Sequence, residues 1–470
     1  MRFESTIDTI VELWRADMLS QVLEYARSQR ERYVEDLLEY LAIPSVSAQP
    51  DHARDVKMAA LWLADYLRAA GLRAELIATP GHPLVYAEWS GHDHHRPTVL
   101  IYGHYDVQPA EPFELWQSDP FQPVVRDGYI YARGASDNKG QHLAHVNAVA
   151  SYLRCEGTLP VNVKFLLEGE EEIGSPNLGS FIAQHRDLLA CDCVMISDGS
   201  LRSLTQPVLT YGLRGLAGFE VHVRCLAHDV HSGHYGGNVQ NPALALAQIL
   251  AALKDAAGRV TVPGFYDDVR TLSAEERRSL ARIPYSEADL VRETGALAAF
   301  GEPEFTISER RGARPTLEVN GMWSGYIGPG SKTIIPATAH AKITCRLVPH
   351  QEPMKVIQQV QAAMRAAAPA GVEISFSDER GSPASLIALD AAEVQAAIRA
   401  AQHTYGNPPL YELEGGSIPI VHDFQTQLGK PIILLGFGLP EDNIHAPNER
   451  FALSCYEKGM EASIRFLAEL

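Results

Sequence analysis

The chain has 470 residues, and 40 Lys and Arg against 58 Asp and Glu give it a formal net charge of −18. Hydrophobic residues make up 46% of the sequence and charged residues 21%, a globular composition that excludes disordered, collagen-like and disulfide-stapled proteins. The length predicts two or three domains, and the acidic balance disfavours nucleic acid and anionic membranes as partners.

The first part of the chain predicts helices alternating with strands. Apolar residues three and four apart indicate helices, and short apolar runs bounded by turn residues indicate strands. Asp127 followed by Gly128 indicates a hairpin turn. This alternation is typical of a layered α/β sheet. The expected elements are helices at 20–41, 51–70 and 139–153, strands at 97–102, 161–167 and 193–196, and a hairpin over 125–131.

The pattern changes near Gly212. Segments 218–226 and 338–348 alternate apolar and polar residues, as half-exposed strands do, and helices are expected from Asn241 and Pro353. Between these helices lies a polar, proline-containing stretch that reaches Arg314. This middle third predicts an α+β module with an antiparallel sheet.

The first pattern resumes after Ser382, with helices expected at 391–405, 418–428 and 454–470 and a buried strand at 431–435. We therefore expect the α/β fold class, with a mixed sheet flanked by helices and an inserted α+β domain. The predicted division is 1–19 for an N-terminal extension of unassigned role, 20–213 and 382–470 for the main domain, and 214–381 for the insert.

Histidine or acidic residues follow several of the predicted strands. In open α/β sheets, ligands bind beyond the carboxyl ends of the strands, so these side chains are expected to meet at one edge. Another acidic residue precedes the helix at 139–153. The candidate site residues are His104, Asp106, Asp137, Glu171, Glu172, Asp198 and His445.

Histidines with carboxylates and no cysteine form a ligand set for Zn, Mn or Co in a hydrolytic site. The ligands exceed what one ion needs, which favours two ions sharing a carboxylate. Asp106 lies two residues after His104 and is expected to support the second ring nitrogen of that histidine. Glu171 and Glu172 are adjacent and point differently, so one can bind metal while the other accepts a proton.

The segments YGHYDVQP, YARGASDNKG, LLEGEEEIGS, MISDG, DVHSGHYGG and EGGSIPI resemble the M20 family of metallopeptidases. The resemblance is greatest to its dimeric dipeptidase branch, which includes carnosinase and cytosolic nonspecific dipeptidase. It runs from about residue 20 to the end of the chain.

The resemblance implies a role for each candidate residue. His104 and Asp198 would bind one metal, Glu172 and His445 the other, and Asp137 both. Glu171 would be the general base, Asp106 would stand behind His104, and a cis peptide bond would follow Asp137. Glu170 departs from the dipeptidase pattern, which has Met there, and this extra acid could perturb the base.

The resemblance also implies a shared active site. His231 would reach the active site of a second copy in a homodimer formed through the inserted domain, and would act there as a catalytic donor to the substrate carbonyl oxygen. The C-terminal carboxylate of the substrate would be held by Thr333, Arg346, Gly416 and Ser417.

The sequence therefore predicts a metallodipeptidase that uses two divalent ions per chain, with Zn expected first and Mn or Co as alternatives. Glu171 would act on a water that bridges them, and small peptides with a free carboxylate would be the substrates. An N-acyl-amino-acid amidohydrolase of the same family is the second reading, and a non-catalytic binding protein the third. We expect a cytoplasmic location, with reduced cysteines and no membrane span. The histidine-rich run at 92–95 should lie at the opposite edge and bind no metal.

Overall fold

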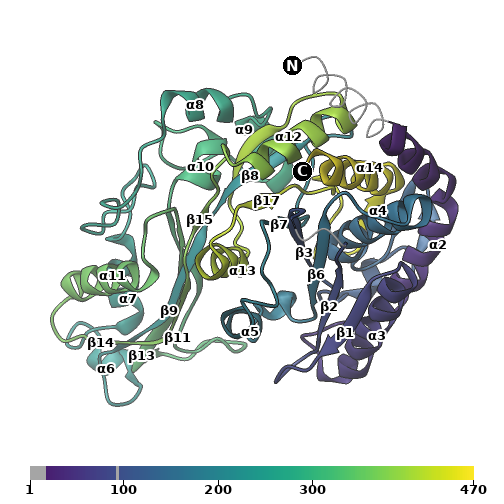
Figure 1. Ribbon diagram of the computed structural model, residues 1–470. Helices are drawn as coiled ribbons and strands as arrows, with labels where there is room; N and C mark the ends of the chain where they lie inside the picture. Colours follow the sequence, from purple (N-terminus) through teal and green to yellow (C-terminus); the bar gives the residue numbers. More distant parts are fainter. Residues whose placement is uncertain (1–16, 92–94) are drawn as a thin grey trace. The chain divides into compact units, whose positions relative to one another are not determined.

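The computed structural model (Figure 1) describes residues 17–91 and 95–470. These residues form two compact units. Unit 1 contains the described residues up to Thr210, together with Ile387–Tyr411 and Asp423–Leu470. Unit 2 contains Tyr211–Leu386 and Glu412–His422. The most N-terminal residues and most of the histidine-rich run at 92–95 lie outside the described residues, so the predictions made for them stay predictions.

The core of unit 1 is a mixed sheet with the strand order β1-β2-β6-β3-β7-β17. The neighbours β6-β3, β3-β7 and β7-β17 are parallel, and the strands at the β1 edge are antiparallel. Strands β3 and β7 are buried almost throughout, which explains their continuous apolar sequence. The strands are β1 Arg73–Ile77, β2 Leu84–Trp89, β3 Thr98–His104, β6 Asn162–Glu168, β7 Cys193–Ile196 and β17 Ile432–Leu434.

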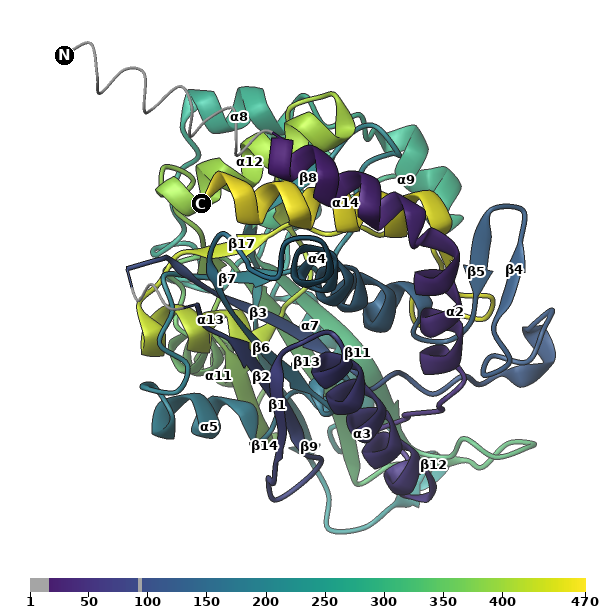
Figure 2. The same ribbon diagram turned by 45° about the vertical axis from the view of Figure 1, so that its right-hand side comes forward.

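Helices cover this sheet on both faces (Figure 2). Helix α4 contacts β3, and a side chain on Gly103 would strike His142 of α4. The preceding residue, Tyr102, points the opposite way and meets the ring of Phe424 at 5.5 Å, so α4 and Phe424 lie on opposite faces. The longer helices are α2 Arg30–Leu41, α3 Ala53–Ala69, α4 Gly140–Glu156, α12 Ala392–Tyr405 and α14 Leu453–Glu469.

The prediction of one continuous helix at 20–41 is wrong. Residues 17–28 are helical, and a turn at Gln29 separates them from α2. The hydroxyl of Ser28 donates to the carbonyl of Tyr25, a side-chain bond of the kind that bends helices. The predicted helix at 418–428 is α13 Pro419–Asp423 followed by a π-helical turn, Phe424–Leu428.

Smaller elements complete unit 1. The hairpin is confirmed, with its turn at Asp127 and Gly128. None of the helices in the described ranges combines the length and apolar composition that crossing a bilayer requires. The elements are helix α5 Leu178–Gln184 and strands β4 Val124–Arg126, β5 Tyr129–Tyr131 and β18 Arg450–Ala452; β8 Val208–Leu213 and β16 Leu410–Glu414 lead from unit 1 into unit 2.

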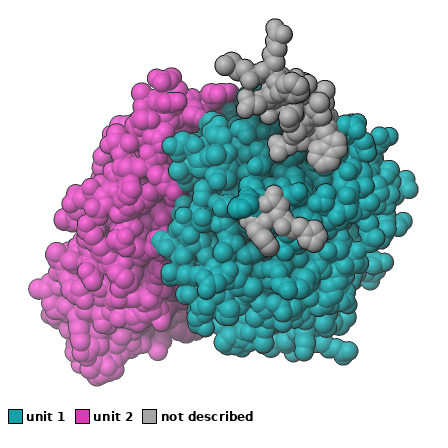
Figure 3. Space-filling view, in the orientation of Figure 1, with its two compact units in different colours: residues 1–210, 387–411, 423–470 teal, residues 211–386, 412–422 magenta. Residues whose placement is uncertain are grey.

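Unit 2, coloured magenta in Figure 3, contains the predicted antiparallel sheet, with the strand order β11-β13-β9-β14. Side chains of alternate residues, such as Val221 and Ile343, pack with Ile249 of α7 and Val360 of α11, so one face of the sheet is core. The elements are β9 Gly215–Arg224, β11 Thr316–Ser324, β13 Thr338–Leu347, β14 Glu373–Ser382, α7 Pro242–Ala251 and α11 Pro353–Ala367.

The polar stretch before Arg314 contains three short helices that the sequence analysis did not predict. Each begins at a Ser or Thr whose side chain and the acidic residue three positions later bond each other's backbone N–H, the capping-box pattern. The helices are α8 Ala274–Leu280, α9 Glu287–Thr294 and α10 Ile307–Ala313.

Unit 2 also contains the segment Glu412–His422, outside the predicted insert of 214–381. Its backbone accepts hydrogen bonds from Arg214, and its Ser417 accepts one from Arg346. These contacts join residues about 200 and 71 positions apart, which no local sequence pattern reveals. The remaining elements are β10 Val230–His231, α6 Ser232–Tyr235, β12 Ile334–Ile335 and β15 Ser385–Leu386.

Candidate metal centre

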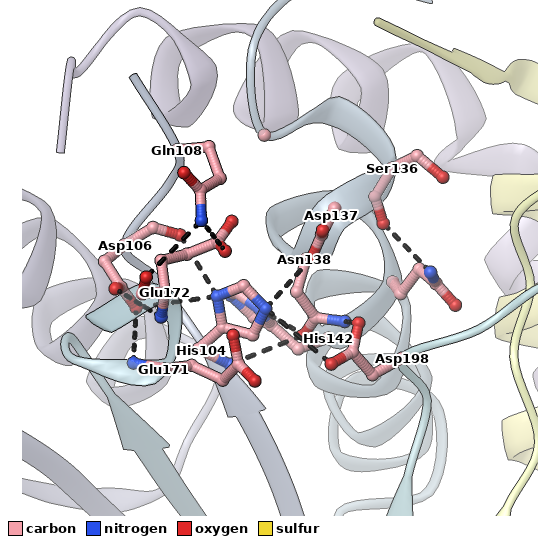
Figure 4. A network of polar contacts seen from close by, with 12 residues as sticks. His104, Asp106, Gln108, Ser136, Asp137, Asn138, His142, Glu171, Glu172 and Asp198 are labelled. Carbon is pink, nitrogen blue, oxygen red and sulfur yellow. Dashed lines mark hydrogen bonds and ion pairs between the residues drawn. The ribbon is translucent and has the colours of Figure 1, made fainter. Parts of the chain in front are cut away.

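The carboxyl ends of three parallel strands in unit 1 bring histidine and acidic side chains together (Figure 4). His104 is the last residue of β3, Asp198 follows β7, and Glu171 and Glu172 lie in the turn after β6. Asp137 lies just before α4. Strand-to-helix connections at this edge thus converge as the sequence analysis expected.

Two groups of possible metal ligands share Asp137. His104, Asp137 and Asp198 form one group, and Asp137, Glu172 and His445 form the other; in each, the ligand atoms lie within 4.8 Å of one another. The Nε2 atom of His104 is 3.0 Å from Oδ1 of Asp137, and Nε2 of His445 is 2.9 Å from Oδ2. Each oxygen of Asp137 therefore faces a different histidine.

Asp198 and Glu172 are the carboxylates that belong to only one of the two groups each. An oxygen of Asp198 is 3.8 Å from Nε2 of His104, and an oxygen of Glu172 is 3.3 Å from Nε2 of His445. The Asp137–Asn138 peptide bond is cis, as expected. Next to it, the amide of Asn138 donates to Asp198 at 3.1 Å.

The electrostatics of this cluster fit divalent cations. Burial and the charges of Asp198, Glu172 and Asp137 raise the pKa of Glu171 to about 9, although His104 opposes them. Burial and Asp137 likewise raise the pKa of Asp198 to about 7. These shifts indicate negative charge that two histidines do not neutralise. Bound divalent ions would supply the missing positive charge and lower both pKa values.

The pKa values of the two histidines and of Asp137 are shifted toward their charged forms. Burial opposes charge on Asp137, but bonds from His104 and His445 hold its pKa well below the ordinary range. Bonds to Asp137 and Glu172 raise the pKa of His445 to about 10. Metal ions would have to displace these protons, because histidine binds metal as the neutral ring.

Asp106 supports both His104 and the acidic turn. The Nδ1 atom of His104 is 3.1 Å from the backbone carbonyl of Asp106 and 3.5 Å from its carboxylate. The carboxylate also accepts the hydroxyl of Ser47 and the backbone N–H groups of Glu171 and Glu172, at 2.6, 3.3 and 3.1 Å. Asp106 therefore fixes the backbone that carries both glutamates, a contact that the sequence analysis did not predict.

Glu170, the departure from the dipeptidase pattern, is directed elsewhere. Its carboxylate accepts the backbone N–H of His82 at 3.1 Å and the amide of Asn177 at 2.8 Å. These bonds hold the extra acid apart from the groups that most strongly shift Glu171.

Sequence reasoning missed Glu449, which is fully buried. One of its oxygens accepts from Arg133 at 2.8 Å and Gly134 N–H at 2.9 Å, and the other from the N–H groups of Ser136 and Asp137 at 3.0 Å each. Glu449 therefore holds the turn that presents Asp137. The sequence offered one indication of this role, which is that Glu449 lies only four residues after the predicted ligand His445.

Two amide side chains next to the ligands were also missed. Gln108 donates to a carboxylate oxygen of Glu172 at 2.8 Å. Asn138 accepts weak bonds from the N–H of His104 and the ring of His142, at 3.4 and 3.3 Å. Such neighbours orient metal ligands.

In unit 2, His231 is exposed at the end of β10. Its Nδ1 accepts the backbone N–H of Gly233 at 2.9 Å, so the neutral ring carries its proton on Nε2. His234 stacks on the same ring, with centroids 4.5 Å apart. Thr333 lies nearby, since its carbonyl accepts the N–H of Ser232.

The other predicted substrate residues also meet within unit 2. Arg346 donates to Oγ of Ser417 at 2.8 Å, and that hydroxyl donates to the carbonyl of Arg214. The N–H of Gly416 donates to the side chain of Glu414 at 3.2 Å. Ser417 thus orients the Arg346 guanidinium, while the Gly416 N–H already has an acidic partner.

Comparison with known proteins gives a consistent result. The family model described as Peptidase family M20/M25/M40 matches residues 100–469. The chain is 32% identical to the Beta-Ala-His dipeptidase of Rattus norvegicus, over 96% of this chain and 95% of that protein. It is 31% identical to the Cys-Gly metallodipeptidase dug1 of Schizosaccharomyces pombe, over 96% and 98%. The solved M20 family metallo-carboxypeptidase Sso-CP2 from Sulfolobus solfataricus has a TM-score of 0.82 and 35% identity, over 93% of this chain and 98% of that one.

Proposed function

Because the chain belongs to peptidase family M20/M25/M40 and is a hydrolase of peptide bonds, we propose that it cleaves dipeptides with a free C-terminal carboxylate. The observation that carries the proposal is Asp137, whose two oxygens face two different histidines in two ligand groups. Two of the relatives named above are a Beta-Ala-His dipeptidase and a Cys-Gly metallodipeptidase, which favours small substrates.

Two divalent ions would be held at the centre, one by His104, Asp137 and Asp198 and the other by Asp137, Glu172 and His445. Such ions supply Lewis acidity, which polarises a scissile carbonyl and makes water a stronger acid. We expect Zn, with Mn or Co as alternatives, because imidazole and carboxylate suit all three.

We assign the proton transfers to Glu171. Its carboxylate belongs to neither ligand group, yet burial and the nearby ligands Asp198, Glu172 and Asp137 raise its pKa. A carboxylate free of metal bonds can take a proton from the attacking water and return it to the leaving amine. Asp106 supports this role by holding the backbone N–H of Glu171.

We propose that residues of unit 2 bind the C-terminal carboxylate of the substrate and so fix its direction in the site. The guanidinium of Arg346, oriented by Ser417, can bind a carboxylate through two parallel N–H bonds. Thr333 and the N–H groups of Gly416 and Ser417 would complete the site, and the Gly416 N–H would exchange Glu414 for the substrate. The free carboxylate of the substrate is therefore a requirement.

We further propose that the enzyme is a homodimer and that His231 serves the partner's active site. The bond from Gly233 leaves Nε2–H of His231 as a donor, the form needed to stabilise a developing oxyanion. Edge strand β11 and the turn after it expose Val319, Met322, Trp323, Tyr326 and Ile327. An edge strand with exposed apolar residues is suited to pairing with a second copy.

A substrate panel tests the proposal. Protein freed of metal by a chelator and then reconstituted with Zn, Mn or Co would be assayed on Beta-Ala-His, Cys-Gly, other dipeptides, a tripeptide, and N-acetyl and N-succinyl amino acids. We expect dipeptides to have the highest kcat/KM and the chelated protein to be inactive. Preference for the N-acyl substrates would instead establish the second reading, an N-acyl-amino-acid amidohydrolase.

A further inference from the structure

Two histidines face each other on the sheet of unit 2. His222 of β9 and His340 of β13 are directly paired in the strand register. Their Nδ1 atoms are 2.8 Å apart, and both side chains are partly buried. Both alternate with core residues such as Val221 and Ala341, so the pair lies on the sheet face opposite α7 and α11.

The other ring nitrogen of each histidine has a hydroxyl partner. Nε2 of His222 is 2.7 Å from Oγ of Ser377, and Nε2 of His340 is 3.1 Å from Oγ1 of Thr338. If both rings carry their protons on Nε2, the hydroxyl oxygens accept them. Both Nδ1 lone pairs then point into the same space, which suits a shared cation. When one ring instead carries its proton on Nδ1, the 2.8 Å contact is a hydrogen bond between the rings.

This arrangement has the features of a metal site. Histidines that bind metal ions usually donate their second ring N–H to an oxygen, which fixes the ring and its tautomer. Binding requires no net loss of a proton from the neutral pair, only a shift of one proton from Nδ1 to Nε2 of the same ring. The nearest charges do not oppose a cation, because positive and negative side chains are paired. These charged neighbours are Glu220 with Lys342 and Arg224 with Glu373.

We propose that His222 and His340 bind a divalent transition-metal ion through their Nδ1 atoms, separately from the catalytic centre. Imidazole nitrogen favours Cu²⁺, Ni²⁺ and Zn²⁺, with Cu²⁺ bound most tightly. The ion joins the central strands β9 and β13 of unit 2. The site needs only unit 2 and is independent of the proposed peptidase activity.

The neighbouring Trp323 provides a local probe. Its ring stacks on His340, with centroids 5.2 Å apart and an interplanar angle of 18°. A paramagnetic Cu²⁺ ion on His340 would quench the fluorescence of this tryptophan. In the Trp323→Phe variant, the same Cu²⁺ ion should bind with much less quenching.

The test uses holoenzyme loaded with two Zn²⁺ per chain and titrated with up to one equivalent of Cu²⁺. Electron paramagnetic resonance should show nitrogen ligation of one Cu²⁺ per chain, without release of Zn²⁺. His222→Gln and His340→Gln should each raise the apparent Kd for Cu²⁺ about tenfold or more. Residues that only orient a metal ligand already change metal affinity by about that factor, and the loss of a ligand should cost at least as much. The control His403→Gln, an exposed histidine of unit 1, should bind Cu²⁺ as the unchanged protein does.

The unchanged protein gives an independent check, because lowering the pH from about 7.5 to about 5.5 protonates histidine and should release the Cu²⁺. The proposal is overturned if Cu²⁺ binds equally to His222→Gln and His340→Gln. Equimolar release of Zn²⁺ would place the Cu²⁺ in the catalytic centre and also overturn it. Failure of the unchanged protein to bind Cu²⁺ at this site would also overturn the proposal, and the two rings would then form only a hydrogen bond.

Discussion

Replacing Glu449 by Gln should destabilise unit 1 and loosen the metal centre. The buried carboxylate accepts four hydrogen bonds, two at each oxygen. An amide keeps one oxygen and turns an N–H₂ group toward the other pair of donors. In either orientation the buried Arg133 loses its charged partner. One orientation also leaves the N–H groups of Ser136 and Asp137 without an acceptor, and the other leaves Arg133 and the N–H of Gly134 facing an N–H₂ group.

The expected cost follows from these contacts. Removing one partner of a buried ion pair costs about 3–5 kcal/mol, and Arg133 and Glu449 have side-chain exposures of 1% and 0%. Because the turn presenting Asp137 also loses support, metal affinity should fall about 10–100-fold, as for other groups that orient ligands. Burial raises the pKa of Glu449, so the difference between the carboxylate and the amide should be largest at neutral pH and should narrow as falling pH protonates Glu449.

The assay is urea unfolding followed by tryptophan fluorescence in a Trp323→Phe background, which leaves the described tryptophans Trp62, Trp89 and Trp116 of unit 1. The matched control is Glu469→Gln, whose carboxylate pairs with Arg399 at 2.6 Å but is partly exposed. The control should lose at most about 1 kcal/mol. Equal losses in the two variants, with unchanged metal affinity, would refute the role of Glu449.

Three further predictions concern substrate polarity, the shared site and pH. C-terminally amidated dipeptides should be poor substrates, and Arg346→Lys should not restore the site, because an ammonium lacks the two-pronged guanidinium; equal rates on free and amidated dipeptides would contradict this. His231→Ala and Glu171→Ala should each be nearly inactive, yet random mixing should restore about a quarter of wild-type activity, since half the dimers gain one working site; no recovery would place His231 in its own chain's site. Burial, opposed by Tyr102 but aided by Asp106, raises the pKa of Glu168 to about 8, so its stabilising effect in the metal-free protein is full below about pH 4.5 and is lost by about pH 8. Relative to Glu168→Gln, the unchanged protein should lose up to about 1.4 kcal/mol per pH unit in that window; parallel stability curves would contradict this.

The features that the sequence predicted are those that depend on local patterns. Continuous apolar strands ending in His104 or preceding Asp198 indicated both the sheet and its functional edge. The break at Gln29 was missed because the apolar pattern continues through it, and the side-chain bond of Ser28 to the Tyr25 carbonyl next to the break gives no periodic signal in the sequence. The helices before Arg314 were missed although their capping residues were present in the sequence.

Other features depend on contacts between distant residues. Glu449 is 312 positions from Asp137, and its role becomes evident only when the turn that it holds is known. The pairing of His222 with His340 depends on strand register across 118 positions. A shift of one residue would turn either side chain to the opposite face, so composition and spacing could not reveal this pair.

The most direct test of the proposed catalytic centre is to measure metal content and kcat on one sample of Glu171→Gln. If Glu171 transfers protons and the two groups sharing Asp137 hold the ions, the variant should retain two metals per chain. Its kcat should fall about 10²–10⁴-fold, the scale of a lost general base. Loss of one metal would make Glu171 a ligand, and two metals with unchanged kcat would remove it from the reaction; either result would contradict the assignment.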